Sequence, residues 1–282
     1  MSWFQEKLYD HWQQAFLVGK ELYRSEGGLQ EIVLFETPHF GRVLALDGVI
    51  QVTTGDEFVY HEMLAHLPIY AHGNVKTACV VGGGDGGMLR EILKHKGVEQ
   101  AVLVEIDAGV VEFCRKYMPS VSDGAFEDPR TEVIIADGIE FMANTDRKFD
   151  LIVVDSTDPI GPGEVLFTEA FYKDCARCLT EDGIIVNQNG VPFMQGQEVT
   201  DTYRRRKPHY KDVGFFVAAV PTYVGGFMAL GWACRSERPR RESAETIRAR
   251  FQAAPVTTRY YTPDIHQAAF ALPKFVQDLI KD

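Results

Sequence analysis

The sequence predicts an α/β protein in which a doubly wound, mostly parallel seven-stranded sheet follows a small antiparallel β domain. From residue 77 onward, apolar strand patterns alternate with helical ones, which is typical of a parallel sheet with helices on both faces. Before residue 54 the apolar stretches are short, and Asp47-Gly48 between two of them is a strong hairpin signal. The 282 residues, 45% of them hydrophobic, suffice for one large core and a smaller one.

The N-terminal part is expected to form a small antiparallel sheet followed by a helix. Its strands are expected at residues 21–25, 31–37, 42–46 and 49–53. A helix is predicted over residues 57–71, and the turn at His72-Gly73-Asn74 ends it. We therefore predict an N-terminal domain of residues 1–72, which includes this linking helix, and a larger domain of residues 73–282.

The larger domain is predicted to contain seven strands, each followed by a helix or a turn. The strands are expected at 77–81, 100–106, 131–136, 149–155, 183–189, 213–220 and 227–234, and helices near Gly87, Ala108, Gly138, Thr168, Gln195 and Ser243. Because only the turn at 221–226 separates the last two strands, they are expected to be antiparallel.

Composition and charge exclude several classes of protein. A formal net charge of −11 argues against a nucleic-acid partner, because nucleic-acid binders gather positive charge on one face. The one basic run, Arg204 to Lys207, is expected on a solvated helix face. The longest apolar runs are far shorter than the roughly 20 residues that a membrane span needs, and residues 1–20 lack a signal-peptide pattern. We therefore expect a cytoplasmic protein.

The five cysteines predict neither a disulfide framework nor a metal centre. Cys175 and Cys178 form a C-x-x-C pair within an expected amphipathic helix, and no second pair completes a metal site. We interpret both as ordinary helix residues. No cluster of His, Cys and Asp has metal-ligand spacing in the sequence, so we expect no metal.

A glycine-rich loop follows the first strand of the larger domain. Gly82, Gly84 and Gly87 satisfy G-x-G-x-x-G, and Glu105 ends the next strand at about the separation of a ribose-binding acid. Asp85 lies inside this loop, where a dinucleotide would place its pyrophosphate. Two like charges about 4 Å apart cost roughly 4 kcal/mol at an effective dielectric constant near 20, which disfavours a pyrophosphate. The ligand is therefore expected to be a phosphate-free adenosine that carries positive charge.

An adenosine sulfonium fits this description and favours the methyltransferase-like variant of the Rossmann fold. Glu105 is then expected to bind the ribose, and Asp137 with the Gly138 backbone to lie near the adenine. Asp137 could equally cap the helix that starts at Gly138, and both roles can coexist. Asp85 would repel the carboxylate of S-adenosylmethionine and attract the amine of its decarboxylated form, so we expect the decarboxylated donor.

Two aspartates, Asp155 and Asp158, follow the fourth strand of the larger domain at the edge where open parallel sheets bind ligands. Acids beside a cationic electrophile suggest an amine nucleophile, with Asp155 accepting its proton as the bond to carbon forms and Asp158 orienting it. The alternative is an Asx turn, although Pro159 and Gly161 leave no helix to cap. Residues 159–163 are expected to fold over the site as a lid.

The chain resembles the spermidine synthases, which are polyamine aminopropyltransferases. The resemblance runs almost from end to end, through LQEIVLFE, LDGVIQ, DEFVYHEM, GGGDGGMLRE, VEIDAGVV, ADG, DSTDPIGPGE, LFTEAFY and PTYVGG. It implies a small β domain joined to a methyltransferase-like domain, in a homodimer or homotetramer. It also implies transfer of an aminopropyl group from decarboxylated S-adenosylmethionine, a co-substrate, to putrescine, which gives spermidine and methylthioadenosine with no further cofactor.

The resemblance assigns roles to residues that match its motifs. It makes Asp155 the proton acceptor, and it implies a polar contact from His61, where many relatives have glutamine, without imidazole catalysis. Tyr60 and Tyr223 would line the polyamine chain, although each is also a plausible core residue. The nucleoside is assigned to Gln30, Asp85, Glu105, Asp137, Gly138 and Pro162, and the polyamine to Gln51, Tyr60, His61, Asp158 and Tyr223.

Three other functions remain open at this point. An amine N-methyltransferase would share the fold, but Asp85 opposes the carboxylate of its donor. A dehydrogenase would share the glycine pattern but lacks a favourable place for pyrophosphate, and a polyamine-binding protein would keep the acids without turnover. The length of the acceptor, whether putrescine, cadaverine or spermidine, is not determined, because a pocket discriminates one methylene by only about 1–3 kcal/mol.

Overall fold

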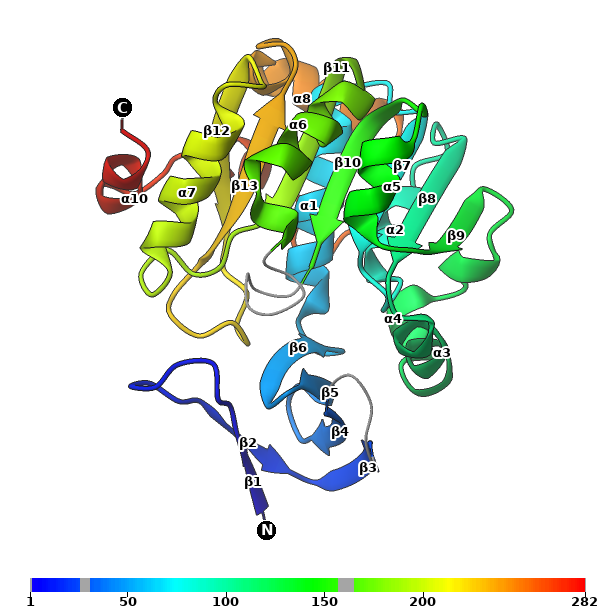
Figure 1. Ribbon diagram of the computed structural model, residues 1–282, viewed down its shortest axis with the longest axis vertical. Coiled ribbons are helices and arrows are strands. Elements are labelled where there is room, and N and C mark those ends of the chain that lie inside the picture. Colours follow the sequence, from blue (N-terminus) through cyan, green and yellow to red (C-terminus); the bar gives the residue numbers. More distant parts are fainter. Residues whose placement is uncertain (1, 26–30, 157–164, 282) are drawn as a thin grey trace.

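A computed structural model describes residues 2–25, 31–156 and 165–281 of the chain. A layered α/β domain holds the larger sheet, and the N-terminal strands form a smaller part at one end of it (Figure 1). The arrowhead of β10 (Phe149–Asp155) points toward the N-terminal strands (Figure 1). The carboxyl edge of the parallel strands, where such sheets bind ligands, therefore faces the smaller part.

The N-terminal part contains a hairpin and a four-stranded antiparallel sheet. The hairpin pairs β1 (Ser2–Gln5) with β2 (Ala15–Val18), and the sheet order is β3 (Lys20–Arg24), β4 (Ile32–Thr37), β5 (Gly41–Leu46), β6 (Val49–Thr53). One face of this sheet buries Phe35 and Val43 beneath the hairpin, and the other packs Leu34 and Leu44 against Phe113 of the larger domain. Burial on both faces fixes the register, because a shift of one residue would exchange the faces.

The larger sheet has seven strands in the order β12-β13-β11-β10-β7-β8-β9. Strands β7 to β11 are parallel, and β13 is antiparallel to both of its neighbours, β11 and β12. The bounds of the strands not yet given are β7 (Thr77–Gly82), β8 (Gln100–Glu105), β9 (Thr131–Ile135), β11 (Leu179–Gln188), β12 (Asp212–Ala218) and β13 (Met228–Cys234). This order confirms the doubly wound, mostly parallel sheet that the sequence predicted.

Helices cover both faces of this sheet (Figure 1). One face packs against α1, α2 and α8, and the other against α5 and α6. The helices are α1 (Glu57–His72), α2 (Gly87–Leu93), α3 (Ala108–Tyr117), α4 (Pro119–Ser122), α5 (Gly138–Asn144), α6 (Glu169–Cys178), α7 (Gly196–Arg206), α8 (Ala244–Ala253), α9 (Pro263–Ala269) and α10 (Lys274–Leu279). None of those in the described ranges has the length and apolar character of a membrane span.

Helix α1 connects the two parts of the chain but packs with the larger one. Met63 and Leu67 are fully buried in the same core cluster as strand residues Val80 and Val153. Gly73, in the left-handed conformation at φ 86°, ends the helix by donating its N–H to the carbonyl of Ile69. The helix is thus fixed on the sheet at its far end, while its first turn reaches the carboxyl edge of the sheet. The predicted domain boundary at His72 stays a prediction.

The sequence prediction differs from the structure at several places, and helices α4, α9 and α10 are among the elements that were not predicted. Strands β1 and β2 were not predicted, because they are short, half-exposed and joined by nine residues without a hairpin signal. Strand β11 begins at Leu179, four residues before its expected start. Arg206, expected on a solvated face, is fully buried with its guanidinium 4.4 Å from the Tyr172 ring centre. Its spacing from buried Val199 and Thr202 places it on the inner face of α7.

The glycine loop leads to a stability prediction. Gly82 has φ +83°, and a Cβ at this position would lie 2.1 Å from the backbone oxygen of Asp155. Gly82→Ala should lower the free energy of unfolding by roughly 2–4 kcal/mol, because it adds backbone strain to a clash. Denaturant unfolding measures this change. Gly97→Ala is the matched control, since its Cβ would meet only one atom, at 4.0 Å; equal effects of the two substitutions would contradict the prediction.

Candidate active site

A cavity of about 430 Å³ lies at the carboxyl edge of the larger sheet. Residues of the N-terminal part, including Gln51, form one wall, and the glycine loop with the ends of β8 and β10 forms the opposite wall. Its volume falls within the usual range of small-molecule sites. The site therefore depends on both parts of the chain.

Asp155 is held at this edge by the glycine loop. Gly83 donates its backbone N–H to the Asp155 carbonyl at 2.8 Å, and a Cβ on Gly83 would lie 2.9 Å from Asp155 Oδ2. Tyr60 donates its hydroxyl to Asp155 Oδ1 at 2.8 Å. Asp155 Oδ2 is buried and has no hydrogen-bond partner within the described ranges. A buried carboxylate oxygen without a donor calls for one, such as a ligand N–H.

Aromatic residues line the cavity beside Asp155. Tyr60 comes from α1 and Tyr223 from the turn between β12 and β13, and their rings lie edge to face at a centroid distance of 6.1 Å. The Tyr223 hydroxyl donates to the backbone carbonyl of Gln51 in β6. The structure thus places Gln51, Tyr60 and Tyr223 together on the cavity wall, where the sequence had left a core role open for the two tyrosines.

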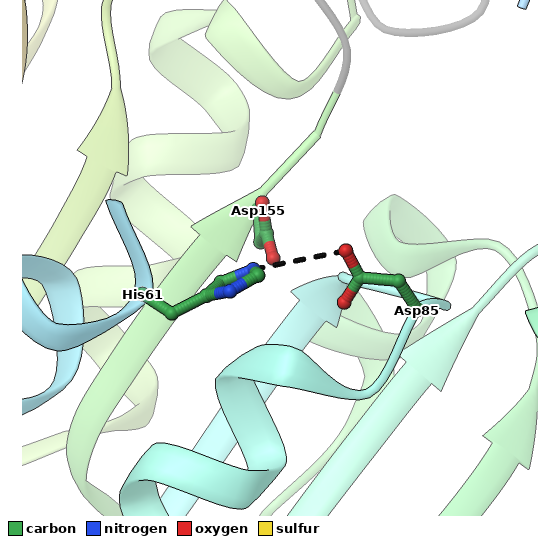
Figure 2. Close-up of side chains that lie close together, drawn as sticks. All are labelled: His61, Asp85 and Asp155. Atoms are coloured by element: carbon green, nitrogen blue, oxygen red, sulfur yellow. Dashed lines mark ion pairs between the residues drawn. The ribbon is translucent and has the colours of Figure 1, made fainter. Parts of the chain in front are cut away.

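Figure 2 shows that His61 on α1, Asp85 in the glycine loop and Asp155 converge. One ligand atom from each lies within 4.8 Å of the others, and His61 Nε2 is 3.7 Å from Asp85 Oδ2. On its other side, His61 Nδ1 lies 2.6 Å from Glu57 Oε2. Burial lowers the pKa of His61, but the charges of Asp85, Glu57 and Asp155 outweigh it and raise the pKa to about 9. The imidazole is therefore protonated at neutral pH.

The carboxyl group of Asp155 is a weaker acid than an ordinary aspartate. Burial, and after it the negative charge of Asp85, raise its pKa to about 6 against the opposing effects of His61 and the Tyr60 hydroxyl. Its affinity for a proton is thus closer to that of a general base at neutral pH. Strongly shifted groups of this kind gather at functional sites.

Three further acids of the cavity are placed by strand ends and helix starts. Asp85 Oδ1 accepts the Gly87 N–H at 2.7 Å, so a carboxylate already occupies the loop amide that a phosphate would need. Glu105 ends β8, and burial raises its pKa. Asp137 caps α5 by accepting the Ile139 N–H at 2.7 Å. Helix capping, which the sequence offered as one role of Asp137, is therefore present. All three line the cavity, as does Gly138.

Three of the predicted site residues lie outside the described residues: Gln30, Asp158 and Pro162. The expected lid at 159–163 lies outside them as well. The assignments for these positions stay predictions.

Several residues that line the cavity could not be predicted from the sequence. Glu6 and Tyr9, from the unpredicted N-terminal hairpin, reach it, as do Gln188 and Gln195. Glu6 is buried, and its Oε1 accepts the N–H of Ile50 at 3.0 Å. The WFQE segment, most of which forms the short strand β1, carries no local signal for a site. Only the folding of the hairpin against the larger domain brings these residues together.

The cluster of His61, Asp85 and Asp155 has a spacing that also suits a metal ion. Metal binding requires a deprotonated imidazole, whereas the three carboxylates around His61 hold its proton with a pKa of about 9. The expected absence of a metal at this cluster stays a prediction. Cys175 and Cys178 are buried on α6, as the sequence predicted for ordinary helix residues.

Comparison with protein families and known proteins gives a consistent result. Residues 57–242 match the family described as the spermine/spermidine synthase domain, and residues 2–54 match the spermidine synthase tetramerisation domain. The polyamine aminopropyltransferase of Ruegeria sp. (strain TM1040) is 54% identical over 277 residues, covering 98% of each chain. That of Shigella sonnei (strain Ss046) is 50% identical over 277 residues, covering 98% of this chain and 96% of its own.

Solved structures agree with these relatives. A spermidine synthase in complex with the transition-state analogue AdoDATO superposes with a TM-score of 0.93 at 37% identity, covering 99% of this chain and 94% of its own. The spermidine synthase of Thermotoga maritima superposes with a TM-score of 0.90 at 35% identity and the same coverage. The similarity thus extends over both parts of the chain.

The hydrogen bond from Tyr60 predicts the effect of its removal on Asp155. Tyr60→Phe should raise the pKa of Asp155 above about 6, because a bond to the ionised form is lost, with a shift of up to about one unit. Carboxyl NMR titration measures the shift. Tyr70→Phe on the same helix is the control, since that hydroxyl donates to the Ala254 carbonyl at 2.8 Å. An unchanged or lowered Asp155 pKa in Tyr60→Phe would refute the assignment.

Proposed function

The chain belongs to the spermine/spermidine synthase family and is an aminopropyltransferase, and we propose that it transfers the aminopropyl group of decarboxylated S-adenosylmethionine to putrescine. The products are then spermidine and methylthioadenosine. Within this reaction we propose Asp155 as the proton acceptor. The observation that carries the proposal is the buried Oδ2 of Asp155, which lacks a donor among the described residues at the wall of the cavity.

The pKa of Asp155 bears on the proton transfer. An amine with a pKa near 10.4 would lose its proton to an ordinary aspartate at a cost of roughly 9 kcal/mol. With Asp155 at a pKa of about 6, that cost falls to about 6 kcal/mol. A sulfonium beside the amine lowers the amine pKa further, so the proton moves to Asp155 as the new bond between nitrogen and carbon forms and the sulfonium leaves as a thioether.

The charges around the glycine loop support the decarboxylated donor. The Asp85 side chain is 15% exposed, its Oδ2 lies beside the protonated His61, and Asp155 is close to both. The donor amine adds a positive charge next to these carboxylates, whereas the carboxylate of S-adenosylmethionine would add a negative one. Glu105, Asp137 and Gly138 would hold the ribose and adenine at the other end of the same cavity. Gln30 and Pro162 belong to the same proposed set.

The acceptor is proposed to lie between Tyr60 and Tyr223, whose rings would contact its methylene chain. Gln51, His61 and Asp158 would provide polar contacts for its amines. The alternatives of an N-methyltransferase, a dehydrogenase and a non-catalytic binding protein are not favoured by the family to which the chain belongs.

Location and assembly complete the proposal. All five cysteines are free and buried, which suits a reducing compartment, and we propose the cytoplasm. The match of residues 2–54 to a tetramerisation domain supports a homo-oligomer, either a dimer or a tetramer. We propose no cofactor and no metal beyond the nucleoside co-substrate, and no nucleic-acid partner.

A product assay tests the proposed reaction. The protein is incubated with putrescine and either donor, and the amine product is weighed by mass spectrometry. We expect an aminopropyl increment from decarboxylated S-adenosylmethionine. A methyl increment would support a methyltransferase, and the absence of any product with bound putrescine would support a binding protein.

Asp155→Asn tests the role of the proton acceptor. Turnover should fall by about 10²-fold or more, because the amide cannot accept the proton, while donor affinity should stay within a few fold. Unfolding should show no loss of stability at neutral pH, since the raised Asp155 pKa means that folding disfavours the ionised form. Asp146→Asn, at an exposed position, is the charge-matched control. Lost donor binding in Asp155→Asn would make Asp155 a donor-binding residue.

Asp85→Asn tests the electrostatic account of donor choice. The amide keeps an acceptor for the Gly87 N–H but removes the negative charge. The affinity ratio between decarboxylated S-adenosylmethionine and S-adenosylmethionine should fall by about tenfold or more, because roughly 1.4 kcal/mol of charge discrimination is lost. Calorimetric titration with both ligands measures the ratio, again with Asp146→Asn as the control. An unchanged affinity ratio in Asp85→Asn would contradict the electrostatic account of donor choice.

A further inference from the structure

A buried chain of ionic contacts lies behind the main cavity, and His61 connects it to Asp85, which lines that cavity. Glu57, one turn before His61 on α1, does not line the main cavity. Its Oε2 lies 2.6 Å from His61 Nδ1, and the His61 ring is 2% exposed. On the opposite edge of the ring, Nε2 faces Asp85 Oδ2 at 3.7 Å (Figure 2). Glu57 and the substrate region thus contact different nitrogens of one imidazole.

Arg90 on α2 holds the Glu57 carboxylate in place. Its two terminal nitrogens donate to Glu57 Oε1 at 3.1 Å and Oε2 at 2.8 Å, which is a bidentate pair. Arg90 also donates to the Val121 carbonyl at 2.6 Å, so it is anchored to α4. The His61 and Arg90 contacts outweigh the effect of burial and lower the pKa of Glu57 to about 2. Glu57 therefore stays ionised and keeps a proton on Nδ1.

The backbone of α2 packs closely against the imidazole. A Cβ on Gly87, the first residue of α2, would lie 2.3 Å from His61 Cε1 and 2.5 Å from Nδ1. The ring is therefore in direct contact with the backbone of α2. Rotation of the ring would break the short contact to Glu57, so Nε2 is fixed toward the acids of the site.

A second cavity, of about 30 Å³, lies at this point. Its walls include His61, Asp85 and Asp155, and the last two also line the main cavity. Its volume is enough for a water molecule or the head of an ammonium group. The other ionisable groups on its wall are Asp56, Glu57, Tyr60 and Tyr223, and Arg90 stands behind Glu57. His61 is the only basic side chain among the described residues of this wall.

We propose that Glu57 is a positioning residue that keeps one imidazole proton on Nδ1 of His61, so that an ammonium group binding at Asp85 and Asp155 displaces the other proton, from Nε2, to solvent. The proposal rests on the proposed function, which supplies the ammonium substrate. No bond to carbon changes in this step: one proton leaves Nε2, and the substrate cation takes over its role as counter-charge.

The displacement follows from the charges at the site. Without ligand, the protonated His61 is the counter-ion of Asp85 and Asp155. An arriving ammonium group competes for the same carboxylates, and a second cation a few ångströms away lowers the pKa of the imidazole. Nδ1 keeps its proton because it is bound to an ionised carboxylate, so Nε2 loses its own. The neutral Nε2 then faces the ammonium as a hydrogen-bond acceptor, which is the polar contact expected of His61.

Calorimetric titration in several buffers tests the proposal. The intact protein is titrated with methylthioadenosine, which carries no charge, and then with putrescine in its presence, at about pH 8, where Asp155 is ionised and a free amine stays protonated. The slope of the observed enthalpy against the ionisation enthalpy of the buffer counts released protons. We expect no release with methylthioadenosine and close to one proton per site with putrescine.

Three variants separate positioning from stability. His61→Gln keeps a polar contact but has no proton to lose, so release should vanish while putrescine still binds. Glu57→Gln keeps an acceptor for Nδ1 but lowers the pKa of His61. Proton release disappears above this pKa, about 9 in the wild type, because the imidazole is then already neutral. The pH limit of release should therefore be lower in Glu57→Gln. Glu62→Gln is the matched control, because this buried carboxylate on α1 accepts backbone N–H groups of residues 259–261. Its release profile should match the wild type.

The outcomes are distinguishable from failure of the proposed function. Aminopropyl transfer without proton release in the wild type overturns the positioning proposal and leaves the function intact. Release that persists in His61→Gln overturns it as well, because the proton then comes from another group, and an unshifted profile in a folded Glu57→Gln makes Glu57 merely structural. Proton release without transfer supports the proposal and rejects the function, whereas the absence of putrescine binding rejects both.

Discussion

The confinement of a carboxylate at the end of β10 is the constraint on which the site depends. Asp155 is fixed through its backbone by the glycine loop and through its side chain by Tyr60. Asp85 stands close enough to oppose its ionisation, and His61 close enough to support it. A carboxylate held between these two effects can be ionised when a cation binds and still accept a proton from it. Each neighbour of Asp155 is therefore part of its acid–base chemistry.

The same edge of the sheet would remain an open groove without the N-terminal strands. Gln51 and Glu6 line the cavity from that side, and packing of Leu34 and Leu44 against Phe113 fixes the strands to the larger domain. Walls on both sides shield the groups of the cavity from part of the solvent, which strengthens the charge interactions inside it. The small β domain therefore completes the ligand site in addition to its own fold.

Buried polar contacts outside the main cavity hold the segments that form its walls in fixed positions relative to one another. Asp56, just before α1, accepts the Thr53 hydroxyl at 2.6 Å and the Thr222 N–H at 2.8 Å. It thereby joins β6, the start of α1 and the turn that carries Tyr223. Because a buried carboxylate with its donors removed is costly, these contacts define one arrangement of the three segments. The pair of Glu57 and Arg90 does the same between α1 and α2.

Most of the strands and helices between β3 and α8, the glycine loop, and the placement of Asp85, Glu105, Asp137 and Asp155 near strand ends could be predicted from the sequence. These features follow from local periodicity and from the rule that parallel strands present their carboxyl ends at one edge. The place of Glu6 in the cavity wall, the burial of Arg206 and the ionic contacts of Glu57 were not predicted. Each of them depends on contacts with segments that are distant in the sequence. The protonation of His61 and the raised pKa of Asp155 could not be predicted from the sequence, since a pKa depends on burial and on charges brought together by folding.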